Sequence, residues 1–74
     1  MKDQKAIVIK CIKNDFPAFV IAGTDPCAID TMQHYLKIAK EKGCSEEFLT
    51  DMQDVIDEMS LFQKEQPEAI KIPD

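Results

Sequence analysis

The residues with the most reactive side chains are three cysteines and a single histidine. Cys11, Cys27 and Cys44 lie 16 and 17 residues apart, and His34 falls between the second and the third. Zinc sites built on cysteine usually contain a closely spaced pair, which this sequence lacks. We therefore predict no metal site. Because the cysteines are odd in number and no secretory signal segment is evident, we also expect them to be reduced thiols.

A cysteine–histidine pair could instead act as a nucleophile and its base. Cys27 and His34 fall seven residues apart on a predicted helix, which places them about 10 Å apart along its axis. That separation is too large for direct proton transfer. No other group of nucleophile, base and electrophile can be assembled, so we predict that the chain is not an enzyme and has no catalytic or cofactor-binding residues.

The run Gly23-Thr24-Asp25-Pro26 connects a predicted strand to a predicted helix, a geometry that can hold phosphate. It matches neither the P-loop pattern nor the dinucleotide-binding glycine pattern. Asp25 and Pro26 are typical of a helix start, where an aspartate accepts hydrogen bonds from free backbone N–H groups and a proline fits the first position. We interpret this run as a helix cap.

The composition restricts the class of protein and of partner. The 74 residues allow one small domain, 1–74, and 45% hydrophobic with 31% charged residues is ordinary globular composition. The net charge is -5, and all nine basic residues are lysines. Without arginine, an acidic chain is poorly suited to binding nucleic-acid phosphates directly. No apolar run is long enough to cross a membrane, so we expect a cytoplasmic protein with no membrane partner.

The N-terminal third is rich in β-branched residues, which favours strands. Residues 5–13 and 18–22 are predicted to form two antiparallel strands, so that 5–22 is a β-hairpin with turn residues at Asn14. Pro17 suits the first residue of a strand or an edge, because it cannot donate a backbone hydrogen bond. The expected sheet therefore has two strands.

The rest of the chain has the apolar spacing of helices. We predict a helix over 25–42 that ends at Gly43, and a second over 45–66 that ends before Pro67. The tail, 67–74, is expected to be a docked extended segment or a short third strand. This arrangement is an α+β fold, in which the β-hairpin packs on an antiparallel helical hairpin. The expected helix contact joins Phe48, Met52, Val55, Met59 and Phe62 to Ile29, Met32, Leu36 and Ala39.

The predicted β-hairpin carries apolar side chains on both of its faces. A two-stranded sheet with one face in water should instead alternate apolar and polar residues. The helices cover only one face, so a second copy of the chain is expected to cover the other, in a homodimer or a larger assembly. The residues expected to mediate self-association are Ile7, Val8, Ile9, Phe19, Val20 and Ile21.

A second candidate surface lies on the helices, for a ligand or another protein. The second helix has an acidic outer face that includes Asp54, with Leu61 in the middle of it. Such a face is usually only solvated, and the functional alternative is the docking of a basic partner. His34 and Tyr35 on the first helix complete this candidate surface.

Parts of the sequence resemble a known group of proteins. The stretch 16–26, then Tyr35 and Ala39, then 58–63 and the end of the chain from Pro67, are similar to short uncharacterised proteins of phages, prophages and related bacterial genomes. The resemblance covers residues 16–74 and contains no catalytic motif. It implies a bacterial or viral cytoplasmic setting and no particular mechanism.

Two functions of different classes agree with these features. The first is a non-enzymatic, self-associating accessory protein of phage or mobile-element type that acts by binding a protein partner. The second is an oligomeric sponge, which sequesters a nucleotide-like small-molecule signal as a counter-defence. For the sponge, Lys5, Lys10, Lys13, His34 and Tyr35 are expected to line pockets between subunits.

Overall fold

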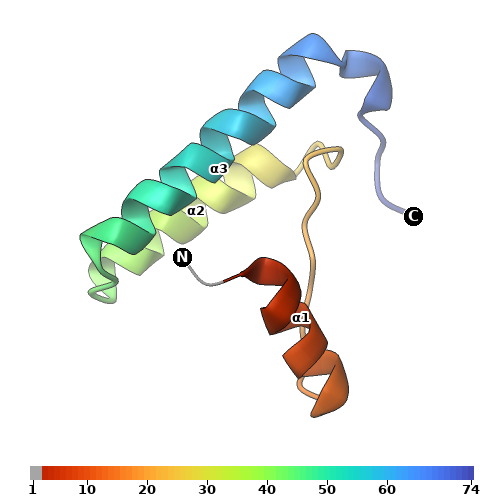
Figure 1. Cartoon of the computed structure of the whole chain (residues 1–74). Coiled ribbons are helices and arrows are strands. Elements are labelled where there is room, and N and C mark those ends of the chain that lie inside the picture. The colour runs from red at the N-terminus through yellow and green to blue at the C-terminus, as the bar shows by residue number, and fades with distance from the viewer. Residues whose placement is uncertain (1–2) are drawn as a thin grey trace.

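The computed structural model describes residues 3–74 as an arrangement of helices. The elements in chain order are α1 (Gln4–Lys13), α2 (Ala28–Glu41), α3 (Glu46–Glu65) and the 3-10 turn η1 (Pro67–Ala69). Helices α2 and α3 lie side by side as an antiparallel hairpin, and α1 stands away from them at the other end of a long connection (Figure 1). Residues 1 and 2 of the predicted domain lie outside the described part.

The connection between α2 and α3 is short because the sequence satisfies both helix ends locally. Gly43 has a φ of 82°, the left-handed conformation that glycine adopts without strain. The amides of Gly43 and Cys44 donate to the carbonyls of Lys40 and Ala39, which closes the end of α2 as a Schellman motif. The Ser45 hydroxyl then accepts from the Phe48 amide at 3.1 Å and caps α3.

The hydrophobic core is small and lies between α2 and α3. Leu36, Met52 and Ile56 form its centre, and Ile56 is only 2% exposed. Ala28 and Ala39 are also buried. Small residues on α2 let the larger side chains of α3 approach closely, so these two helices form the stable part of the fold.

The expected β-hairpin over 5–22 is wrong, and with it the α+β fold class. Within residues 3–74 the chain forms no strand. Residues 4–13 form a helix, which begins where the Asp3 carboxylate accepts from the Lys5 amide at 3.0 Å. A helix satisfies its backbone hydrogen bonds within itself, whereas an isolated two-stranded sheet is marginal, and this difference outweighs the weak strand preference of Ile and Val.

The segment 16–22 is extended, as expected of a strand, but it pairs with no other strand in the described chain. It runs from the end of α1 to the start of α2, and the tail passes close to its upper end (Figure 1). The tail forms no third strand either. It is held by one bond from the Lys71 amide to the Thr24 carbonyl, at 3.0 Å.

Helix α1 ends in a Schellman motif that lacks the usual glycine. The Asp15 and Phe16 amides donate to the carbonyls of Ile12 and Cys11, while Asp15 itself has a φ of 55°. Aspartate tolerates this conformation better than most residues, but glycine adopts it without the Cβ penalty. We expect Asp15→Gly to stabilise α1 by about 0.5–1 kcal/mol. Slower amide hydrogen exchange in α1, with α2 and α3 unchanged, would verify this, and faster exchange would contradict it.

The chain leaves an unusual amount of surface exposed for its size. A monomeric globular protein of this mass, 8.4 kDa, should expose about 4,600 Å², whereas this chain exposes 6059 Å². Its radius of gyration is 13.5 Å, compared with about 11 Å for a compact chain of the same length. The surplus comes from the N-terminal part, because α1 contains no buried residue.

Candidate binding groove

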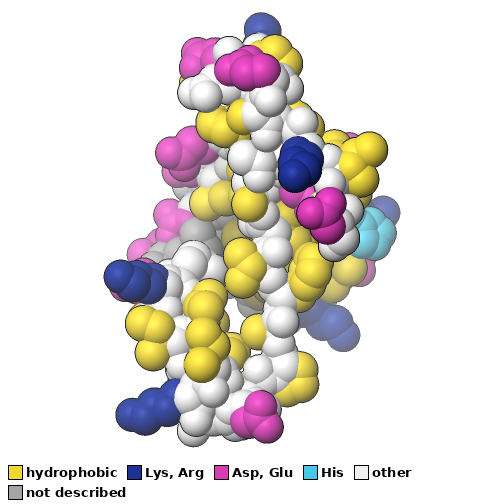
Figure 2. All heavy atoms as spheres, turned by 90° about the vertical axis from the view of Figure 1, so that its right-hand side faces the viewer, with side chains coloured by type: hydrophobic (Ala, Val, Ile, Leu, Met, Phe, Trp, Pro, Cys, Tyr) yellow, Lys and Arg dark blue, Asp and Glu magenta, His cyan; other side chains and the backbone are white. Residues whose placement is uncertain are grey.

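A groove lies between the N-terminal part of the described chain and the helical hairpin. Its volume is about 540 Å³. One wall is α1 with the extended segment that follows it, and the other wall is formed by α2 and α3. Figure 2 shows hydrophobic side chains gathered on the lower half of the molecule, where α1 and the segment 16–22 lie.

The N-terminal wall begins with one face of α1. Four residues of α1 line the groove, and their intervals of three, one and three place them on one helix face. The chain then reverses after α1, so the extended segment adds four consecutive residues beside that face. The lining residues of this wall are Gln4, Ile7, Val8, Cys11, Ala18, Phe19, Val20 and Ile21.

The opposite wall is a side of the helical hairpin that borders the buried contact between α2 and α3. Met52 links the two regions, because it is buried in the core and also borders the groove. Tyr35 is half exposed, and it brings the only hydroxyl group of the lining. The lining residues of this wall are Met32, Tyr35, Phe48, Met52, Val55 and Met59.

A row of acidic side chains borders the groove on α3. Projected around the helix, Glu47, Asp51, Asp54 and Glu58 lie next to the groove-lining residues of α3. Helix α3 carries seven acidic residues and one lysine in total, whereas α1 carries three lysines and no acidic residue. The groove is therefore apolar inside, with a negative edge on the hairpin and positive charge on α1.

Comparisons with known proteins identify no relative. No protein-family model matches the sequence, no curated protein matches it, and no solved structure matches the fold. The resemblance to phage and prophage proteins stays a prediction.

The groove brings together residues that the sequence placed on two separate surfaces. Five of the six residues expected to mediate self-association line it: Ile7, Val8, Phe19, Val20 and Ile21. Ile9 does not, because it lies on another side of α1. Tyr35, expected on a ligand surface, lines the groove as well, whereas His34, Asp54 and Leu61 lie outside its lining. Sequence reasoning missed the methionines Met32, Met52 and Met59 as groove residues, having assigned them only to the helix contact.

The upper end of the extended segment is tied to the hairpin by one side chain. Gln63 on α3 donates from Nε2 to the carbonyls of Gly23 and Asp25, at 3.0 and 2.9 Å. Gly23 lies against α3. A Cβ built at this glycine would be 3.7 Å from side-chain atoms of Met59 and Phe62, which is an ordinary contact distance. These contacts hold the end of the extended segment against α3, and the rest of the segment and α1 extend from there.

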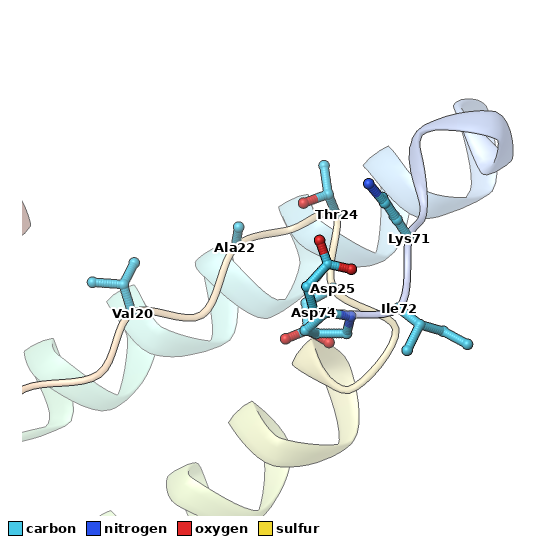
Figure 3. A pocket seen from close by; sticks show the side chains of 8 residues that line it. Val20, Ala22, Thr24, Asp25, Lys71, Ile72 and Asp74 are labelled. Carbon is cyan, nitrogen blue, oxygen red and sulfur yellow. The ribbon is translucent and has the colours of Figure 1, made fainter.

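A second, smaller hollow of about 280 Å³ lies where the tail passes the extended segment. Val20, Thr24, Asp25 and Lys71 surround it, together with the last residues of the chain (Figure 3). Two of its polar groups already have structural partners: the Asp25 carboxylate accepts from the Cys27 amide at 2.7 Å, and the Thr24 carbonyl accepts from the Lys71 amide. This hollow is therefore the place where the tail docks, and it offers less apolar surface than the groove.

Asp25 was expected to cap the helix, but α2 begins at Ala28 and its N-cap position is Cys27, which makes no side-chain cap hydrogen bond. The Asp25 carboxylate instead accepts from the Cys27 amide in the turn just before the helix. Cys27 stands at this helix start and is exposed, while Cys11 and Cys44 are partly buried. A hydrogen bond to the Asp25 carboxylate, together with its negative charge, raises the pKa of the Cys27 thiol. A raised pKa leaves less of the reactive thiolate at neutral pH, so this site is unsuited to nucleophilic catalysis.

We expect Asp25→Asn to accelerate alkylation of Cys27 at neutral pH. The substitution removes the negative charge that disfavours the thiolate but keeps an oxygen that can accept from the Cys27 amide. Iodoacetamide labelling followed by peptide mass spectrometry, from pH 7 to 9, would measure the rate at this thiol alone. An unchanged or slower rate would show that Asp25 does not control the thiol.

Among residues 3–74, no cluster of three or more cysteine, histidine or acidic side chains could hold a metal ion. Between Asp3 and Asp74, none of the helices combines the length and the hydropathy that crossing a bilayer requires.

Proposed function

We propose that the chain is a non-enzymatic accessory protein that self-associates and acts by binding a protein partner. The observation that carries this proposal is the groove. Its volume is about 540 Å³, and its two walls consist mainly of aliphatic, aromatic and methionine side chains. Exposed apolar surface of this kind on a small domain is typical of protein interaction sites, and methionine adapts readily to the shape of a partner.

The surface area supports self-association in particular. The chain exposes 6059 Å², about 1,500 Å² more than a compact monomer of its mass should, and each partner of a stable complex typically buries about 800 Å². The surplus is therefore large enough to supply one side of a stable interface. It lies in the part of the chain that forms the groove wall, since Phe19 is 85% exposed and Val20 is 67% exposed.

The nucleotide sponge remains the alternative proposal. Its expected pocket requires lysines near Tyr35, but within the described lining only Tyr35 and Gln4 provide polar side-chain groups. Phosphate recognition relies on cationic or N–H donors directed at the oxygens. The lining of the single chain therefore favours an apolar occupant, and a phosphate pocket would have to be completed by a second subunit.

Thermal unfolding distinguishes the two proposals. If folding is linked to self-association, the melting temperature should rise with protein concentration, by mass action. The sponge predicts strong stabilisation by a phosphate-bearing small molecule, which a panel of cyclic and linear nucleotides would reveal. Both proposals include self-association, so a melting temperature that is independent of protein concentration would contradict both. Strong stabilisation by one of these nucleotides would reject the accessory-protein proposal.

A further inference from the structure

Helix α1 is the least buried element of the fold and the most basic. It carries Lys5, Lys10 and Lys13 without an acidic side chain, and none of its residues is buried. Ile9 and Ile12 are 53% and 76% exposed, on a side of α1 that does not line the groove. An exposed helix with apolar side chains on more than one side has surface left for a further contact.

The groove offers the complementary surface. Its lining is apolar, and the row of Glu47, Asp54 and Glu58 runs along its edge on α3. A basic amphipathic helix placed in such a groove buries its apolar side chains against the lining and sets its lysines beside the carboxylates. Within residues 3–74, the one basic helix with exposed apolar side chains is α1.

We propose that α1 of a second copy of this chain lies in the groove, with its lysines beside the acidic row of α3, and that the exchange is reciprocal. This inference rests on the self-association proposed above and assigns the surfaces that carry it. Because each copy supplies both a basic helix and an acidic groove, one two-fold axis satisfies both contacts and closes the assembly.

The connection between α1 and the hairpin permits this exchange. The seven residues of 16–22 are already extended and can span up to about 24 Å. They are anchored at their upper end by Gln63. In its own chain α1 forms one wall of the groove, so the space between the walls is left for a side chain or helix from elsewhere.

Charge reversal tests the proposal directly. One variant carries Lys5→Glu with Lys10→Glu on α1, and the other carries Asp54→Lys with Glu58→Lys on α3. Each variant alone sets like charges against each other, and we expect its self-association to weaken roughly tenfold or more. An equal mixture restores opposite charges in both contacts, so a heterodimer should form with an affinity close to that of the wild type. The control is Lys37→Glu with Lys40→Glu on α2, outside the groove. It changes the net charge by the same amount as the α1 variant and should leave association unchanged.

The outcomes separate this inference from the proposed function. A wild-type protein that is monomeric at high micromolar concentration would overturn both. A wild-type protein that self-associates, while the two variants show no gain on mixing, would overturn only the pairing of α1 with the groove. Weak association of each variant by itself, with recovery only when the two variants are mixed, would support the pairing of α1 with the groove. Far-UV circular dichroism would show whether each variant is folded.

A second measurement uses the unaltered chain, so that it does not depend on how the variants fold. Unlabelled and ¹⁵N-labelled wild-type protein are mixed, treated with a carbodiimide that joins lysines to adjacent carboxylates, and digested for mass spectrometry. We expect crosslinks between the lysines of α1 and the acidic row of α3 that combine one light and one heavy peptide. Crosslinks between these elements that never mix the isotopes would show that α1 closes onto its own chain, and would overturn the proposal.

Discussion

Replacing Ile56 by alanine should lower the free energy of unfolding by about 2–5 kcal/mol. Ile56 is 2% exposed and packs in the cluster with Leu36 and Met52. Only a handful of described side chains are buried, so few other contacts can compensate for the cavity. A loss of this size is a large part of the stability of a small domain. Leu36→Ala and Met52→Ala should each cost about 2–4 kcal/mol for the same reason.

Leu61→Ala is the matched control for Ile56→Ala, because both residues lie on α3 and Leu61 is 54% exposed. Its expected cost is within about 0.5 kcal/mol. Urea unfolding followed by circular dichroism, at one fixed protein concentration, would give both values. Equal costs at the two positions would mean that the buried face of α3 is not the one described.

Phe19→Glu should weaken self-association by roughly 30-fold or more, equivalent to about 2 kcal/mol, without unfolding the chain. Phe19 is 85% exposed in the single chain, so its replacement removes little of the folded core. In an assembly its position in the groove would place a charged carboxylate against apolar side chains, where desolvation is unfavourable. Sedimentation velocity over a range of concentrations would measure the change.

Leu61→Glu is the control for this second prediction, because Leu61 is exposed but lies outside the groove lining. It introduces the same charge and should leave the association constant near that of the wild type. Equal effects of the two substitutions would indicate that added negative charge, rather than the groove, determines association. An unchanged dimer in Phe19→Glu would remove the groove from the interface.

The helical hairpin could be anticipated because its boundaries depend on local chemistry. Gly43 provides the left-handed residue, Ser45 the cap and Pro67 the stop, and each acts within a few residues of its own position. The most buried residue was harder to identify. Ile56 is not among the residues expected in the helix contact, because the prediction followed the spacing of Phe48, Met52 and Val55, and two of these residues line the groove without being buried.

The N-terminal prediction failed for a physical reason that the sequence does contain. Gln4, Ile7, Val8 and Cys11 have the spacing of one helix face, and the run from Ile7 to Ile9 is apolar at consecutive rather than alternate positions. The prediction of a strand rested instead on the β-branched residues, although each of them lowers the stability of a helix by only a few tenths of a kcal/mol. The placement of α1 across the groove has no local signal in the sequence, and α1 makes no close backbone contact with α2 or α3 that a pattern could have indicated.

Sedimentation equilibrium of the wild-type chain, from nanomolar to high micromolar concentration, tests the central claim of self-association most directly. We predict a reversible increase in mass from the monomer to a dimer or a larger assembly at micromolar concentration, with helical circular dichroism throughout. A folded protein that keeps the mass of one chain, 8.4 kDa, at the highest concentration would contradict the account.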